Sequence, residues 1–298
     1  MTAVRATLYT DAACPWAYSA SPALRVLEWR FRGQLEWRLV MIGLRDGVTE
    51  SAARAFDPAR SVLGHHGYRD RYGMPFALVP KGRLSATGRA CRAVVAARLL
   101  EPGSEWAVLR VLQLAYFTTD LLLDDDEGIR DALVAAGVDG DEIVEHLDAP
   151  DVSEAYERDR AEARAAAGTA AEAQGKTSTS DSPVRFTAPS IAFEYDGRRL
   201  VAGGWQPVLA YDVLLANLDP TLERTPAPAS PEALFELFPA GLTTAEIALL
   251  LADGPDPAAD LRRTERLLLD LAASGRLERA PLGQDAVWRL APSVVGVA

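Results

Sequence analysis

The stretch Tyr9-Thr-Asp-Ala-Ala-Cys-Pro-Trp-Ala-Tyr18 joins a short apolar strand to a helix, and its cysteine, Cys14, lies at the junction. Pro15 follows at the first helical position, where a missing backbone N–H costs a helix nothing. Cys14 is therefore predicted to be the N-cap of the helix. The unpaired amides and the positive end of the helix dipole stabilise a thiolate there, so we expect the pKa of Cys14 to fall below the free value of about 8.5. Asp11, three residues earlier, is a further influence, because a buried carboxylate would raise the pKa of the thiol instead.

The segments on either side of this stretch predict a β–α–β unit. Val4 to Tyr9 is predicted as a strand, Pro15 to Phe31 as a helix and Leu35 to Ile42 as a second strand, and the crossover should be right-handed. The helix offers the sheet one apolar face, made by residues at three- and four-residue spacing: Ala20, Ala23, Leu24, Leu27 and Phe31.

Beyond residue 45 the strand pattern gives way to helical stretches. The helices expected there are Thr87–Leu100, Glu105–Thr118, Asp126–Ala136, Asp141–Leu147 and Val152–Ala167. Strands are expected again at Ser190–Tyr195 and Arg199–Ala202, followed by a helix at Gln206–Leu218. Asp196-Gly197 between the two strands is a strong hairpin signal.

The order of these features resembles a known fold. Cys14-Pro15-Trp16-Ala17 between a strand and a helix, with Thr187-Ala188-Pro189-Ser190 opening a strand far downstream, is similar to the DsbA-like branch of the thioredoxin superfamily, and within it to the FrnE-like subgroup. Relatives include 2-hydroxychromene-2-carboxylate isomerases and kappa-class glutathione transferases. The resemblance covers about residues 1 to 220. It implies an α/β thioredoxin fold, built from residues 1–45 and 183–219 and interrupted by a long helical insertion at residues 46–182.

The resemblance also implies roles for individual residues. Cys14 matches the nucleophile of the family and Pro189 matches the cis-proline that faces it. Ala188 beside that proline then offers its N–H and C=O to an extended thiol substrate. The motif of the family is Cys-x-x-Cys, whereas position 17 of this chain is Ala, which argues against dithiol–disulfide exchange. The related transferases and isomerases use a single residue at this turn, a serine, to hold the thiol of a bound cofactor.

Other side chains near these motifs are candidate binding groups. Those that flank the sulfur are Pro15, Trp16, Ala17 and Tyr18, with the two aromatic rings serving as pocket walls or as core. His65 and His66, in the glycine-flanked loop Gly64-His-His-Gly67, are candidate acids or bases, or exposed loop residues. Lys176 precedes a hydroxyl-rich segment that leads to Pro189. It is a candidate ligand for the carboxylate of a small thiol cofactor, or a solvated loop residue.

Composition restricts the classes of partner. The formal charge of −11 over 298 residues disfavours nucleic acid and anionic membranes. The N-terminus enters a strand without a signal peptide, and no run approaches the roughly 20 apolar residues of a membrane span, so a cytoplasmic location is expected. Cys14 and Cys91 should then be free, with Cys91 a buried structural residue. Three histidines, with no cysteine or glutamate at ligand spacing, predict no metal site.

A second, smaller domain is expected at residues 231–298, after a proline-rich linker at 220–230. Its predicted elements are helices Pro231–Phe238, Thr243–Ala252 and Pro257–Ser274 and strands Arg276–Glu278 and Ala286–Leu290, with a capping box from Thr243 to Glu246. This α+β pattern resembles a winged helix-turn-helix module. The domain holds six Arg and no Lys against ten acidic residues, so DNA binding is disfavoured and a packing or dimerisation role is expected, including a homodimer.

Three functions stay open at this point. The first is a thiol-dependent oxidoreductase in which Cys14 acts with an external low-molecular-weight thiol such as glutathione or mycothiol, because no second thiol can release a mixed disulfide. The second is a transferase or isomerase in which Cys14 orients the thiol of such a cofactor toward a small electrophile. The third is a non-catalytic, redox-responsive binding or regulatory protein.

Overall fold

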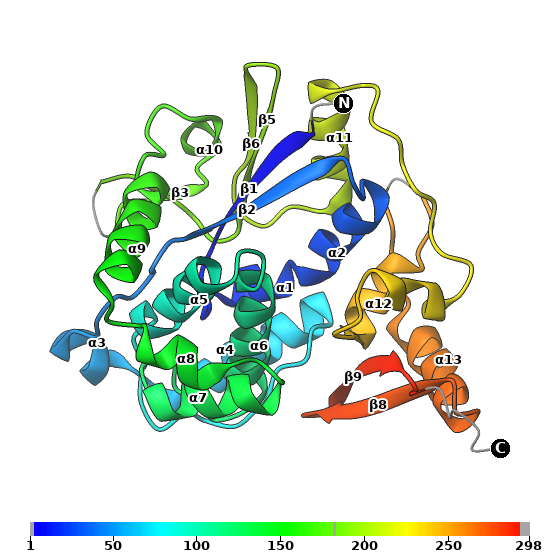
Figure 1. The fold of residues 1–298 in the computed structure, drawn as a ribbon, viewed down its shortest axis with the longest axis horizontal. Coiled ribbons are helices and arrows are strands. Elements are labelled where there is room, and N and C mark those ends of the chain that lie inside the picture. The colour runs from blue at the N-terminus through cyan, green and yellow to red at the C-terminus, as the bar shows by residue number, and fades with distance from the viewer. Residues whose placement is uncertain (1–2, 181–182, 255, 293–298) are drawn as a thin grey trace.

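A four-stranded sheet lies at the centre of the N-terminal part of the chain in the computed structural model, which describes residues 3–180, 183–254 and 256–292 (Figure 1). The strand order is β2-β1-β5-β6, with β1 parallel to β2 and antiparallel to β5. The four strands are β1 (Val4–Thr10), β2 (Leu35–Met41), β5 (Ser190–Tyr195) and β6 (Arg198–Ala202). These match the predicted strands to within one residue at each end. The predicted ends of the insertion, 181–182, and of the C-terminal domain, 293–298, lie outside the described residues.

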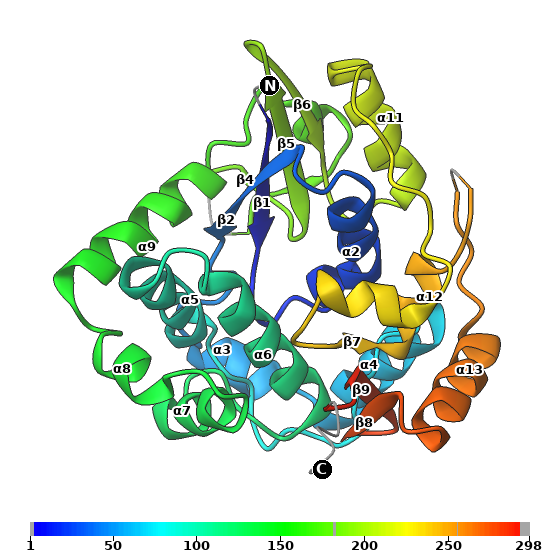
Figure 2. The same cartoon turned by 45° about the vertical axis from the view of Figure 1, so that its right-hand side comes forward.

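The two faces of the sheet are covered by different helices (Figure 2). The helices involved are α1 (Pro15–Ser19), α2 (Ser21–Arg30), α9 (Pro150–Ala163), α10 (Ala170–Ala173) and α11 (Val208–Leu218). Neighbouring residues of a strand point to opposite faces. Leu8 and Phe193 accordingly share one apolar cluster with residues of α2 and α11, while Tyr9 and Ala192 share another with Ala163 and residues of α10.

The hairpin and the crossover helix follow from local sequence. Asp196 and Gly197 both have positive φ, 48° and 70°, and Tyr195 pairs with Arg198, which confirms the predicted two-residue turn. The single helix predicted over residues 15–31 is wrong in one respect, because it is divided at Ala20 into α1 and α2. Pro22, near the start of α2, lacks the N–H that a continuous helix would need there.

The insertion is helical, as predicted, but two of its helices lie before Thr87, where its first helix was predicted to begin. Its helices are α3 (Glu50–Ala55), α4 (Pro58–Tyr72), α5 (Gly88–Leu100), α6 (Glu105–Thr118), α7 (Asp126–Ala135), α8 (Gly140–Glu145) and α9, and two short strands, β3 (Thr177–Ser178) and β4 (Arg185–Phe186), follow α10. The interpretation of residues 64–67 as a loop is wrong, because they lie inside α4. Asp57 accepts hydrogen bonds from the amides of Ala59 and Arg60, Pro58 occupies the first turn, and Gly73 ends the helix with φ 77°. None of the described helices is both long and apolar enough to cross a membrane.

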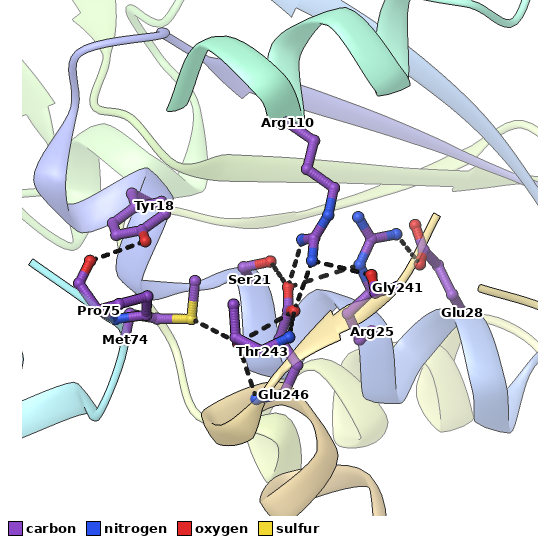
Figure 3. A network of polar contacts seen from close by, with 10 residues as sticks. All are labelled: Tyr18, Ser21, Arg25, Glu28, Met74, Pro75, Arg110, Gly241, Thr243 and Glu246. Atoms are coloured by element: carbon purple, nitrogen blue, oxygen red, sulfur yellow. Dashed lines mark hydrogen bonds and ion pairs between the residues drawn. The ribbon is translucent and has the colours of Figure 1, made fainter. Parts of the chain in front are cut away.

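The C-terminal unit packs against the rest of the molecule. Its elements are the 3-10 helix η1 (Pro231–Glu236), β7 (Leu242–Thr243), α12 (Thr244–Leu250), α13 (Leu261–Ala273), β8 (Leu277–Leu282) and β9 (Asp285–Leu290), with the strand order β7-β9-β8. The predicted capping box from Thr243 to Glu246 is confirmed. Glu246 also accepts hydrogen bonds from Ser21 of α2 and Arg110 of α6 (Figure 3). The unit is therefore tied to both the sheet region and the insertion.

Candidate active site

Cys14 stands at the N-cap of α1, as predicted, and faces the segment that precedes β5. Its Sγ donates a hydrogen bond to the carbonyl oxygen of Ala188 at 3.2 Å, and the Ala188–Pro189 peptide bond is cis. Only 5% of Cys14 is exposed. The structure thus brings Cys14 next to Ala188 and Pro189, although at least 174 residues separate Cys14 from them in sequence.

The predicted low pKa of Cys14 is wrong. Burial raises the pKa of the thiol to about 12, and the carboxylate of Asp11 adds to the rise. The amides of Ala17 and Trp16 act in the predicted direction and lower the pKa, but burial outweighs them. At rest Cys14 is therefore a neutral thiol that serves as a hydrogen-bond donor.

Ala17 fills the place of the second cysteine and is buried at 4% exposure. Cys91 of α5 is fully buried, as predicted, and donates to Asp11 Oδ2 at 3.5 Å. Both thiols are free, and each has its own partner, Ala188 for Cys14 and Asp11 for Cys91. Cys14 is the thiol at the turn that faces the cis-proline.

The segment around Pro189 is held by hydrogen bonds on both sides. Thr187 Oγ1 donates to the carbonyl oxygen of Lys176 at 2.8 Å, and Ser190 Oγ donates to the carbonyl oxygen of Thr187 at 2.6 Å. The amide of Gly204 donates in turn to Ser190 Oγ at 3.0 Å. Lys176, a predicted binding residue, thus lies beside the cis-proline segment, with its backbone bonded there and its side chain exposed.

Trp16 and Tyr18 take different places. Tyr18 belongs to the core, where its hydroxyl donates to the carbonyl oxygen of Pro75 at 2.8 Å. Trp16 is 40% exposed, and its ring centroid lies 5.2 Å from that of Tyr68 and 5.7 Å from that of Tyr72. Of the two predicted wall residues, only Trp16 is available to a ligand.

Sequence reasoning missed the partners of Trp16. Tyr72 of α4 lies 5.0 Å from Trp205, ring centroid to ring centroid, and Trp205 directly follows Gly204. We call Trp16, Tyr68, Tyr72 and Trp205 the aromatic cover. Burial, and then the negative charge that Cys14 carries when ionised, raise the pKa of Tyr68. The available sequence signal was the pair of tyrosines Tyr68 and Tyr72, which had no predicted role because their segment was not predicted to be a helix.

The two histidines lie within α4 and have other contacts. His65 packs on Phe76 and Phe117, with ring centroids 5.4 and 5.7 Å away, and burial lowers its pKa. His66 lies 3.3 Å from the carboxylate of Asp70 on the exposed side of the helix. Their role as acids or bases stays a prediction. Among the described residues, no three His, Cys, Asp or Glu side chains converge in a way that could hold a metal ion.

The chain is similar to known proteins over most of its length. The family described as DSBA-like thioredoxin domain matches residues 6–169, more than half of the chain. A Nitrosomonas europaea structure assigned as a protein disulfide isomerase has 17% identity and a TM-score of 0.56, and the match covers 72% of this chain and 97% of that chain. A Streptomyces coelicolor structure assigned as a DsbA oxidoreductase has 17% identity and a TM-score of 0.53, with coverages of 76% and 94%.

A third structure, the cytosolic disulfide reductase DsbM from Pseudomonas aeruginosa with GSH, has 17% identity and a TM-score of 0.47, with coverages of 66% and 89%. No curated protein sequence matches the chain significantly. At these identities the two structures with TM-scores above 0.5 show a shared fold.

Proposed function

The chain belongs to the family of DSBA-like thioredoxin domains, and from this premise we propose that it is a thiol-dependent oxidoreductase in which Cys14 works alone with an external low-molecular-weight thiol. Glutathione or a mycothiol-like compound would be the co-substrate, and a small disulfide the substrate. A reducing compartment such as the cytoplasm suits this chemistry, because both thiols of the chain are free.

One observation carries the proposal, the hydrogen bond from Cys14 Sγ to the carbonyl oxygen of Ala188. It puts the thiol against a backbone segment whose N–H and C=O can align an extended disulfide by strand-like hydrogen bonds. The amides of Trp16 and Ala17 lower the pKa of Cys14 and therefore favour the thiolate once a substrate replaces the Ala188 contact.

The reaction proceeds in three exchanges. The Cys14 thiolate attacks one sulfur of the substrate disulfide, so that the Cys14–substrate S–S bond forms, the substrate S–S bond breaks and the second sulfur leaves as a thiolate. An external thiolate then attacks the Cys14 sulfur, so that a disulfide forms between Cys14 and the external thiol and the remaining substrate thiol leaves. A second external thiolate attacks the external sulfur of that disulfide, which frees Cys14 and joins the two external thiols in a disulfide. The net result is reduction of one disulfide by two external thiols. Ala17 makes the external thiols necessary, because no neighbouring thiol can resolve the intermediate.

A second candidate function is favoured by the neutral state of Cys14. A protonated thiol that donates a hydrogen bond can donate it equally to the thiolate of a bound cofactor. Cys14 would then orient the cofactor sulfur for addition to a small electrophile or for isomerisation of a double bond. The aromatic cover beside the thiol, with Trp16 partly exposed, supplies a surface for an apolar electrophile.

Intact-mass spectrometry tests the leading proposal. Wild-type protein, Cys14→Ser and Cys91→Ser are treated with oxidised glutathione or oxidised mycothiol. We expect one adduct on wild type and on Cys91→Ser, none on Cys14→Ser, and reversal by excess reduced thiol. No adduct on wild type, with Cys14 shown to be unmodified and reduced, would contradict the proposal.

Comparison of two Cys14 variants separates the candidate functions. Serine keeps a donor at this position and alanine does not. If Cys14 is the nucleophile, both Cys14→Ser and Cys14→Ala lose disulfide reduction. If Cys14 orients a cofactor thiol, conjugation of glutathione to a chloronitrobenzene survives in Cys14→Ser and is lost in Cys14→Ala.

For the C-terminal unit we propose a winged-helix-like module that packs on the enzyme and does not bind DNA. Arg266, one of the basic residues of α13, forms an ion pair with Asp270, and the unit is attached through the buried Glu246. We expect no shift of duplex DNA by the full chain at low salt, where basic contacts are strongest. A shift that weakens steeply as salt is added would contradict this role. A homodimer stays a prediction.

A further inference from the structure

Asp11 is a buried charged residue beside the active site to which the proposed reaction assigns no role. Its carboxylate is fully buried and takes part in four hydrogen bonds. Oδ1 accepts from the amide of Ala13 at 2.9 Å. Oδ2 accepts from the amide of Leu44 at 2.8 Å, from Thr87 Oγ1 at 3.1 Å and from Cys91 Sγ at 3.5 Å. Three segments of the chain thus converge on one carboxylate.

These contacts fix the turn that carries the nucleophile. Ala13 is the residue before Cys14, and the amide of Cys14 itself donates to the main-chain oxygen of Asp11 at 3.4 Å. The same oxygen accepts from Gln113 Nε2 of α6 at 3.3 Å. Leu44 follows β2, and Thr87 precedes α5. The position of Cys14 is therefore set by the insertion as well as by the sheet.

We infer that Asp11 is a positioning residue for Cys14: its buried carboxylate ties the turn before Cys14 to the helical insertion and places a negative charge beside that turn. The inference rests on the proposed function, since it concerns the same thiol. Because the thiolate is the reactive form of cysteine, the resting thiol is protected from oxidation and from unspecific alkylation.

The effect of the Asp11 charge on the acidity of Cys14 depends on the other groups that face the two residues. The titratable or charged groups around the two residues are Cys91 of α5, Tyr116 of α6, Tyr156 of α9, Tyr68 of α4 and Arg185 of β4. Among them only Arg185 is a cation, and it acts on Cys14 more weakly than Asp11 does. Burial also raises the pKa of Asp11 itself, whereas its four hydrogen bonds lower that pKa and so stabilise the carboxylate. Burial and then the charge of Asp11 raise the pKa of Cys91. Removal of the Asp11 charge should therefore make Cys14 more acidic.

The test is the pH dependence of Cys14 alkylation by iodoacetamide in the full chain, followed by peptide mass spectrometry. In Asp11→Asn we expect the profile to move toward lower pH by about one unit, which means about tenfold faster alkylation near pH 8. Hydrogen exchange of the amides of residues 13–18 serves as the second readout. Loss of the hydrogen bonds alone would speed exchange and alkylation in proportion at every pH, whereas loss of the charge also moves the pH midpoint of alkylation.

Gln113→Leu is the matched control, because it removes a hydrogen bond to the main-chain oxygen of Asp11 and keeps the carboxylate. Its profile should coincide with that of wild type. The inference is overturned if Asp11→Asn coincides with wild type, or if both variants shift alike. Should Asp11→Asn fail to fold, the double variant Thr87→Val, Cys91→Ala removes two of the four donors. Loss of these donors raises the pKa of Asp11, so that its carboxylate is ionised less often. We expect the alkylation profile to shift in the same direction as in Asp11→Asn, with alkylation about threefold faster near pH 8. An unshifted profile would again overturn the inference.

This outcome is separable from that of the proposed function. Alkylation reports the acidity of Cys14, whatever thiol or substrate the enzyme uses. Adduct formation with oxidised glutathione reports exchange. A shifted alkylation profile without a glutathione adduct would support the role of Asp11 and reject the exchange reaction. A glutathione adduct with an unshifted profile would support the exchange reaction and reject the role of Asp11.

Discussion

Glu246 of α12 accepts two hydrogen bonds from the guanidinium group of Arg110 of α6, at 2.6 and 2.8 Å, although 136 residues separate them (Figure 3). Glu246 is fully buried, and its further partners are Ser21 and Arg25 of α2 and Thr243 at its own helix N-cap. One carboxylate therefore joins the C-terminal unit, the insertion and the helix that follows the active-site turn. The ion pair is therefore one of the contacts that hold the unit against the rest of the molecule.

Replacement of Glu246 by Gln should destabilise the whole chain. It leaves the buried Arg110 without its counter-charge, and loss of one partner of a buried pair typically costs about 3–5 kcal/mol. Urea unfolding measures the effect. Glu50→Gln is the matched control, because Glu50 forms an exposed ion pair with Arg54 and its loss should change stability by less than about 0.5 kcal/mol. Equal losses of stability in the two variants would show that the buried ion pair contributes no more to stability than the exposed one.

The same carboxylate predicts how stability depends on pH. Burial by itself would raise the pKa of Glu246, but the charge and hydrogen bonds of Arg110 outweigh it and lower the pKa to about 2, from an ordinary value of 4.5. The stabilisation is thus fully present above pH 4.5 and is lost as the pH falls through 2. It amounts to about 3 kcal/mol in this window. Acid unfolding of wild type and Glu246→Gln should converge near pH 2, and curves that stay parallel would contradict this.

The sheet could be predicted from the sequence because its signals are local. Alternating or continuous apolar runs marked β1, β2, β5 and β6, and Asp196-Gly197 marked the hairpin. Helix α4 was missed because it buries none of its residues and so lacks an apolar stripe. Its start signal, Asp57-Pro58, was present in the sequence without a periodic pattern to support it.

The chemistry of the site could be predicted only in part. The sequence correctly predicted Cys14 as the N-cap, a cis bond before Pro189, and amides at the helix N-terminus that lower the pKa of the thiol. Burial of the thiol depends on segments far away in sequence, among them Phe186 of the same apolar cluster. Long-range packing leaves no local signal, so neither the raised pKa nor the aromatic cover could be derived beforehand.

Truncation of the aromatic cover should expose Cys14. Tyr72 contacts both Trp16 and Trp205, so Tyr72→Ala removes the ring that links α1 to the segment after β6. We expect faster alkylation of Cys14 and faster exchange of the amides around it, together. Tyr72→Phe is the control, because the buried Tyr72 hydroxyl has no hydrogen-bond partner among the described residues. It should behave like wild type, and a Tyr72→Ala variant with the wild-type rate would show that the cover does not restrict access.

Ala17→Cys should restore internal release of a mixed disulfide. Position 17 lies on α1, three residues after Cys14, at the place of the second cysteine of the family motif. After addition of oxidised glutathione, the variant should lose its adduct without added thiol and form an intramolecular disulfide, seen as a mass lower by two hydrogens. Wild type should keep the adduct until reduced thiol is added. Ala17→Ser controls for side-chain size and should keep it as well. An adduct that persists equally on Ala17→Cys would mean that the absent second thiol is not what makes Cys14 dependent on an external one.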